Sequence, residues 1–364
     1  MKYIHQFCRF FVGILFIISG LIKLNDPIGT AIKMEEYFEV FALDFHPIFE
    51  YFSSISLLIA IVMCVSEVVL GVALLIYYRM KLTSWLLLIL IVFFTFLTFY
   101  SAYFHKVTDC GCFGDALKLT PWTSFGKDLV LLALIAVLFV HRNKLTSSYQ
   151  SWSGNIIMSL TVLFSFYVAY FTVNHLSFID FRAYKTGADI RKLMKSSEPI
   201  QYKYTLTKEG KDVEFSTYPT DTTYKYKSME IVNKEALPKI TDYAIWNDEG
   251  DFTQESFTGK KLLIFVLKPQ KANTSKMTKI NELVKKLANN GIQTWLVSSS
   301  DYNSIATFRN ENQLSFPYFY ADATVIKTVI RSNPGLMLMQ DGIVRGKWHY
   351  NDVPEIEQML EALK

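Results

Sequence analysis

The chain has 364 residues, of which 51% are hydrophobic, 15% are aromatic and only 19% are charged. Soluble proteins of this size usually carry more charge, so the composition favours a membrane protein. The formal net charge of +4 is small and is spread along the chain, so no nucleic-acid partner is expected.

Five apolar segments in the first half approach the length of about 20 residues that crosses a bilayer. They cover residues 3–22, 55–78, 82–104, 129–140 and 156–173, and the fourth needs its borders, 125–141, to span. A core helix can also be apolar on every side, but five such segments in series favour membrane-spanning helices. The first lacks a small-x-small cleavage site and is expected to be an uncleaved anchor.

Short loops that are basic and free of acids define the expected orientation. Arg79 and Lys81 lie in one such loop, and Arg142 and Lys144 lie in another. Because such loops stay in the cytosol, the N-terminus is expected inside. The loop between the third and fourth spans, and everything after about residue 174, then face outward. In a Gram-negative host we expect a multi-pass inner-membrane protein with a periplasmic C-terminal domain.

The chain after residue 176 has the composition of a soluble protein. Residues 199–231 hold short alternating runs around Glu209-Gly210-Lys211, which predict a β hairpin. Further on, the pattern predicts strands at 262–267 and 294–298, a helix at 274–290, a hairpin at 336–348 and a closing helix at 353–364. The predicted divisions are a four-helix bundle (1–145), a fifth transmembrane helix (146–176), a β-rich connector (177–237) and an α/β domain (238–364).

The four cysteines all lie in the first third of the chain, at Cys8, Cys64, Cys110 and Cys112. A disulfide closed across the single Gly111 would be strained, and strained disulfides are often exchangeable, so Cys110 and Cys112 are redox candidates. An inert disulfide and metal ligation are the alternatives. His105 and Asp109 could add metal ligands, but the set falls short of a closed zinc site, so no metal is assigned. Buried, apolar thiols are expected for Cys8 and Cys64.

Glu67 is a carboxylate inside the second apolar segment, where a charge is costly and usually has a partner or a wet cavity. Lys23, at the end of the first segment, is one partner, although we favour the interpretation that Lys23 snorkels to the interface. If Glu67 is protonated and hydrogen-bonded inside the bundle, its role is structural. If it lines a cavity, it could handle protons or a quinone head group.

Several motifs accompany the cysteine pair. They are Ser19-Gly20-Leu21-Ile22-Lys23 in the first span, Ser66-Glu67-Val68-Val69-Leu70-Gly71 in the second, Cys110-Gly111-Cys112-Phe113-Gly114 between the third and fourth, and then Pro121-Trp122 and Lys127-Asp128. With these motifs the first 145 residues resemble the DoxX and MauE membrane families, and the whole architecture resembles DoxX-family proteins of the Bacteroidota. MauE is the methylamine-utilisation protein thought to help mature a disulfide-rich periplasmic subunit beside a thioredoxin-like partner. The resemblance implies a maturation factor.

The second half carries another set of landmarks. Residues 251–257 precede Gly259-Lys260-Lys261 and its strand, Trp295 lies in the next strand, and Asn333-Pro334-Gly335 precedes the hairpin. This order resembles the thioredoxin-like fold of the TlpA and peroxiredoxin group, which implies a cis proline at Pro334. Where that group has Cys-x-x-Cys, residues 268–273 contain no thiol, so dithiol exchange is not expected there. Asn333 and Pro334 are partner-binding candidates.

The expected fold class is therefore a membrane α-helical bundle of four helices and a fifth, followed by a soluble α/β thioredoxin-like domain. Two functions remain open. In the first, Cys110 and Cys112 exchange thiol and disulfide with an exported client or with a quinone in the lipid, so that the protein is an oxidoreductase that matures envelope proteins. In the second, the chain is a noncatalytic anchor whose thioredoxin-like domain binds a periplasmic protein.

Overall fold

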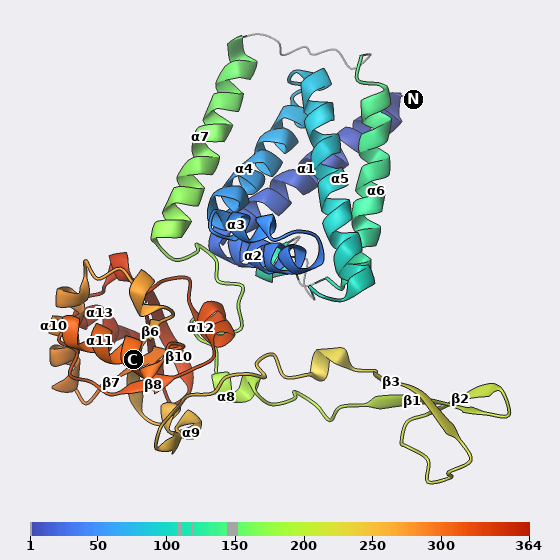
Figure 1. The fold of residues 1–364 in the computed structure, drawn as a ribbon. Helices are drawn as coiled ribbons and strands as arrows, with labels where there is room; N and C mark the ends of the chain where they lie inside the picture. Colours follow the sequence, from blue (N-terminus) through green and yellow to red (C-terminus); the bar gives the residue numbers. More distant parts are fainter. Residues whose placement is uncertain (1, 108–110, 112, 118, 144–151) are drawn as a thin grey trace. The chain divides into compact units, whose positions relative to one another are not determined.

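The structure is a computed structural model that describes residues 2–107, 111, 113–117, 119–143 and 152–364. The chain divides into two compact units, Met1–Phe181 and Arg182–Lys364 (Figure 1). The first unit is helical, and the second contains two β-sheets with short helices.

Five helices of the first unit are long and apolar enough to cross a membrane, counted among the described residues. They are α1 (Lys2–Asn25), α4 (Ser56–Leu75), α5 (Met80–Phe104), α6 (Pro121–Val140) and α7 (Trp152–Asn174). The five predicted spans are therefore confirmed as helices. Helix α6 begins before its apolar run because Thr120 caps it, accepting a hydrogen bond from the Thr123 N–H at 3.3 Å, and because Pro121 suits a first turn.

Two further helices, α2 (Pro27–Asp44) and α3 (Ile48–Ser53), separate the first two spans and cover one end of the bundle (Figure 1). Sequence reasoning did not identify them. Asp26 starts α2 by accepting a hydrogen bond from the Gly29 N–H at 2.9 Å, ahead of Pro27. Tyr37 and Phe41 of α2 then pack against the outer part of α5.

Helices α1 and α4 approach each other closely because small residues line their contact. A Cβ placed on Gly71 would lie 2.8 Å from the Gly13 carbonyl oxygen and 2.7 Å from Ile17. A Cβ on Gly20 would lie 3.0 Å from the Cys64 carbonyl oxygen. Such small-residue contacts allow the backbones of membrane helices to meet.

The second unit is built on a seven-stranded sheet with the order β10-β9-β6-β7-β8-β4-β5. The strands are β4 (Trp246–Asn247), β5 (Gly250–Asp251), β6 (Lys260–Val266), β7 (Gln293–Ser298), β8 (Tyr318–Tyr320), β9 (Gly335–Gln340) and β10 (Ile343–His349). Strands β6, β7 and β8 run parallel, and β9 pairs antiparallel with both β6 and β10. The predicted strands at 262–267 and 294–298 and the hairpin at 336–348 are confirmed.

The main helices of this unit are α10 (Met277–Ala288), α11 (Tyr302–Glu311), α12 (Ala323–Val329) and α13 (Ile356–Ala362), with single turns α8 (Ile190–Leu193) and α9 (Thr253–Ser256). Strand β6 is buried on both faces, because successive side chains alternate and Leu263 and Ile264 are both fully covered. Ile264 packs in one core cluster with Ile280 of α10 and Met359 of α13. The predicted helices at 274–290 and 353–364 are confirmed, with shorter ends.

A separate antiparallel sheet has the strand order β2-β1-β3, with β1 (Tyr202–Lys208), β2 (Lys211–Phe215) and β3 (Lys225–Ile231). The predicted hairpin is confirmed as β1 and β2. Its turn uses Glu209 and Gly210, both with positive φ (53° and 76°). Glycine adopts this conformation without a steric penalty, which explains the Glu-Gly turn.

Candidate functional site in the helical bundle

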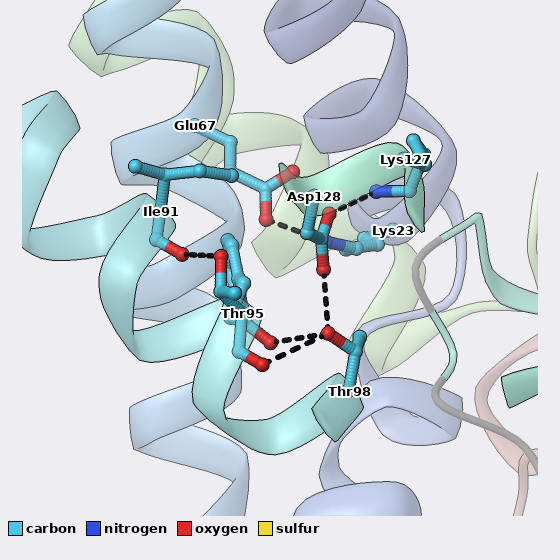
Figure 2. Close-up of polar contacts among 8 residues, drawn as sticks. Lys23, Glu67, Ile91, Thr95, Thr98, Lys127 and Asp128 are labelled. Atoms are coloured by element: carbon cyan, nitrogen blue, oxygen red, sulfur yellow. Dashed lines mark hydrogen bonds and ion pairs between the residues drawn. The ribbon is translucent and has the colours of Figure 1, made fainter. Parts of the chain in front are cut away.

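A buried ion pair joins helices α1 and α4. The Lys23 ammonium lies 2.5 Å from Glu67 Oε1, and the two residues are 6% and 1% exposed (Figure 2). Gly20 lies one helical turn before Lys23, and the space a Cβ there would need is taken by Glu67 Cβ at 3.0 Å. The close helix contact therefore brings the lysine opposite the carboxylate.

This contact corrects one expectation. Lys23 does not snorkel to the interface, because its side chain is buried, pairs with Glu67 and lies with its ammonium 4.7 Å from the centre of the Phe94 ring. The ammonium loses its hydration when it leaves the membrane interface. Its contacts with the Glu67 carboxylate and with the face of the Phe94 ring offset that loss. The other expected role of Lys23, as the partner of Glu67, is confirmed.

The second carboxyl oxygen of Glu67 is buried and has no hydrogen-bond partner among the described residues. In Figure 2 a dashed line joins only the other oxygen of Glu67 to the Lys23 ammonium. An unsatisfied buried oxygen is costly, and native proteins usually satisfy such a group with a water molecule or a proton.

A second buried carboxylate, Asp128, projects from α6. Its Oδ1 lies 2.5 Å from the Lys127 ammonium, and its Oδ2 accepts a hydrogen bond of 3.0 Å from the Thr98 hydroxyl of α5 (Figure 2). Asp128 is 1% exposed, whereas the Lys127 side chain is 22% exposed. The acid is thus inside the bundle and its cationic partner reaches toward solvent.

Both carboxylates line one cavity. Its walls come from three spans and the start of a fourth, and the lining residues are Leu15, Phe16, Ser19, Lys23, Glu67, Ile91, Phe94, Lys127, Asp128 and Leu131. The cavity measures about 20 Å³, and a single water needs about 10–15 Å³ measured in this way. The space suits water and excludes a quinone ring.

A second cavity, of about 40 Å³, shares Lys23 and Phe94 with the first. It extends toward α2 and is also lined by Thr98 and by Gly111, the residue between the two loop cysteines. Gly111 has φ +63°, and a Cβ there would lie 3.4 Å from the Lys33 side chain. Only glycine adopts this φ readily, so the spacer of the Cys-Gly-Cys motif suits its position.

The predicted redox residues Cys110 and Cys112 lie outside the described residues, as does Asp109. Their exchange chemistry therefore stays a prediction. Among the described residues, no group of three or more histidine, cysteine, aspartate or glutamate side chains is arranged to hold a metal ion. Cys8 and Cys64 are buried free thiols, which confirms the expectation for both.

Sequence reasoning quoted Lys127 and Asp128 as part of a motif but gave them no role. A usable signal was present, because the predicted border of the fourth span, 125–141, already placed Asp128 inside the membrane. Thr98 carried no such signal, since a threonine within a span commonly bonds its own helix backbone, and Thr98 also lies 3.0 Å from the Phe94 carbonyl oxygen.

In the second unit, Asn333 connects the two loops at the end of β6. Its side-chain oxygen accepts a hydrogen bond of 3.0 Å from the Leu267 N–H, and its side-chain amide donates one of 3.0 Å to the Lys268 carbonyl oxygen. The Asn333–Pro334 peptide is cis, as predicted. Pro334 is buried and Asn333 is half-buried, so the exposed surface here comes from neighbouring residues such as Lys268.

Comparison with known proteins identifies the helical part. A family model described as "Methylamine utilisation protein MauE" matches residues 1–141. This range ends with α6 and includes the Lys23–Glu67 pair, the Cys-Gly-Cys segment and Asp128. No curated protein matches the chain. Residues 1–141 are therefore similar to the MauE family, and the chain is a multi-pass membrane protein in which a fifth candidate span and a sheet-rich C-terminal domain follow this bundle.

Proposed function

We propose that this protein is a maturation factor for exported envelope proteins that works by thiol–disulfide exchange at Cys110 and Cys112. The observation that carries the proposal is the position of Gly111, which lines a cavity together with the buried Lys23. The MauE match covers the same segment. Thiol–disulfide exchange requires a route for the protons that accompany thiolate formation, and ionisable groups such as Lys23 can supply one.

The proposed exchange has two steps, each of which conserves electrons and protons. A client dithiol attacks the Cys110–Cys112 disulfide through a mixed disulfide, so that the client gains a disulfide bond and the loop becomes a dithiol. The loop dithiol then loses two electrons and two protons to a lipid-soluble quinone, which becomes a quinol. Because both cavities have room only for water, the quinone would approach from the lipid rather than enter the bundle.

The orientation proposed from the basic loops supports this function. Consecutive spans of the bundle alternate in direction, so the end of α1, the helices α2 and α3, the end of α5, the start of α6 and the end of α7 lie at one end of the first unit (Figure 1). With the N-terminus in the cytosol, this end is periplasmic and disulfides can persist there.

A second candidate is a noncatalytic anchor whose C-terminal domain docks a periplasmic partner. The specific observation in its favour is the sheet order β10-β9-β6-β7-β8 with the cis Asn333–Pro334 peptide beside the loop after β6, which supports a thioredoxin-like domain. No cysteine follows Cys112 in the sequence. Such a domain would bind extended chains without exchanging disulfides with them.

The state of the loop pair tests the first candidate. Alkylation mass-shift on intact cells, with and without a reductant, should show a pair that changes state while Cys64 stays unmodified. Cys112→Ser should abolish client oxidation, and Cys64→Ser is the matched control, because Cys64 is a buried thiol on α4. A pair that never changes state, together with full function of Cys112→Ser, contradicts the exchange function.

Site-specific crosslinking tests the second candidate. A photoreactive residue at Lys268, which is exposed and lies beside Asn333, should capture one recurring envelope protein. The control is the same residue at Lys285, an exposed position on α10. Capture of the same proteins at both positions, or of none, would argue against docking at this loop.

A further inference from the structure

We propose that Glu67 and Asp128 are the two ends of a water-bridged proton-transfer site inside the bundle. The inference rests on the proposed exchange function for its purpose, but the site itself is argued from the described residues alone. Its first support is the second carboxyl oxygen of Glu67, a residue of the cavity lining: this oxygen is buried and has no hydrogen-bond partner among the described residues. A group of this kind in a membrane span is kept for a proton, a water or a partner.

The second support is the cavity between the acids. Its volume of about 20 Å³ accommodates one water, and Glu67, Asp128 and the neighbouring Ser19 supply polar walls. A water there can accept a proton from one carboxyl group and pass another to the second. Lys23 holds the far oxygen of Glu67 at 2.5 Å, and Thr98 holds Asp128 at 3.0 Å, so both carboxyl groups are fixed in orientation.

The third support is that the site has an outlet and an inlet. Asp128 pairs with Lys127, whose half-buried side chain reaches solvent. On the other side, Lys23 and Phe94 separate the first cavity from the second, which is lined by Gly111. Protons that leave the loop can therefore travel past Lys23 to Glu67 and from Asp128 to outside water.

The charged and titratable groups around Glu67 are few. They are Lys23 from α1, Cys64 from its own helix α4, and Lys127 and Asp128 from α6, with Lys33 of α2 on the second cavity. Helix α5 presents Phe94 and Thr98, and α7, which also packs on α4, has no charged residue between Trp152 and Asn174. Among the described residues, the cations Lys23 and Lys127 face the two acids, so one added proton changes the net charge of this set.

The site completes the proton balance of the exchange. Each time the loop dithiol becomes a disulfide, two electrons go to the quinone and two protons leave the thiols. The site takes up these protons one at a time and releases them to water beside Lys127. The quinone draws the two protons that it needs to become a quinol from the same water.

The test uses the full-length protein in lipid vesicles and two separate readouts. Infrared difference spectra recorded across a pH titration should show the carbonyl band of a protonated carboxyl group. Glu67→Gln or Asp128→Asn should remove or shift this band, while Glu39→Gln, a variant of an exposed carboxylate on α2 outside the cluster, should keep it. The band should also persist when both loop cysteines are replaced by serine.

The second readout is the rate at which a short-chain quinone reoxidises the reduced loop. Glu67→Gln should slow this rate by about 100-fold and remove its pH dependence, as expected for the loss of a proton-transfer group. Asp128→Asn is a second variant of the same site, so that a folding defect of Glu67→Gln alone cannot explain the result. Both variants must elute from size-exclusion chromatography at the same volume as the parent protein. A band unchanged by both variants overturns the proton site. A loop that never cycles, with a band that Glu67→Gln abolishes, overturns the exchange function and leaves the proton site standing.

Discussion

The two units of this chain bury very different side chains. The bundle encloses the charged residues Arg9, Lys23, Glu67 and Asp128. Among residues 182–364, all of which the structure describes, no aspartate or glutamate is buried. The buried Lys261 of that unit bonds a backbone carbonyl and lies over the Trp295 ring, which are structural contacts. Buried acids are costly, so their restriction to the bundle supports the proposal that the chemistry takes place there rather than in the second unit.

The sharpest way to break this comparison is to remove one partner of the buried pair. Lys23→Met leaves the Glu67 carboxylate desolvated and unpaired, and we expect a loss of about 3–5 kcal/mol in the free energy of unfolding. The double variant Lys23→Met/Glu67→Leu should recover most of that loss, since an apolar pair of similar size is tolerated. Thermal unfolding of the purified full chain measures both. A single variant as stable as the parent would show that Glu67 is neutral without Lys23.

The corresponding test in the second unit removes apolar volume instead of charge. Ile264→Ala empties part of the fully buried β6 core and should cost about 2–5 kcal/mol. Lys260→Ala, at an exposed position of the same strand, should change stability by less than about 0.5 kcal/mol. Hydrogen exchange of the β6 and β7 amides measures the loss. Because the two units are compact separately, exchange in α1 and α4 should not change, and a change there would contradict their independence.

Two glycine-to-alanine variants within the bundle should have smaller effects on stability, and the effects should be opposite in sign. In Gly71→Ala the new methyl group would lie 2.8 Å from the Gly13 carbonyl oxygen, so α1 and α4 must separate, at a cost of about 1–3 kcal/mol. Gly126→Ala on α6 meets nothing within 4 Å and should stabilise its helix by about 0.5–1 kcal/mol. Opposite shifts of the unfolding temperature are expected. Equal shifts would show that the α1–α4 contact is looser than described.

Much of the fold could be predicted from the sequence because the patterns that indicate spans and hairpins lie within short stretches of the chain. Apolar length identified the five spans, and the turn residues at Gly210 and Gly342 marked two hairpins. Helices α2 and α3 gave no such signal, since α2 mixes charged residues with Tyr37 and Phe41, which are buried only because α5 lies against them. In the three-stranded sheet, β3 pairs with β1, and no short-range sequence pattern predicts this pairing.

The site was half predictable for the same reason. Glu67 was evident as a charge within a span, but whether Lys23 paired with it or snorkelled depended on how closely α1 approaches α4, a tertiary property set by Gly20. Thr98 joined the site only because α5 places its hydroxyl beside Asp128. Patterns along the sequence therefore identified Glu67 as a buried charge within a span, whereas the packing of α1, α4, α5 and α6 determined the partners of the buried acids.

The smallest expected effect concerns an acid at the end of the bundle that α2 and α3 cover, where the comparison between buried and exposed charge can be sharpened. Asp44, the last residue of α2, pairs with Lys106 and accepts a hydrogen bond from the Tyr100 hydroxyl. Lys106 first, and then Tyr100, hold the pKa of this carboxyl below its ordinary value of 3.8. A lowered pKa in the folded state means that the contact stabilises above that ordinary value and is lost as the pH falls through the folded-state value.

Asp44→Asn should therefore remove a small, acid-sensitive part of the stability. The parent should lose protection of the amides at the α2 C-terminus on acidification, as followed by hydrogen exchange, whereas the variant should show low protection at every pH. Because the pair is partly exposed, added salt should weaken it in the parent. The buried Lys23–Glu67 pair should resist the same salt, since screening ions do not enter the bundle. Equal salt sensitivity of the two pairs would mean that water reaches the cavity far more freely than its walls allow.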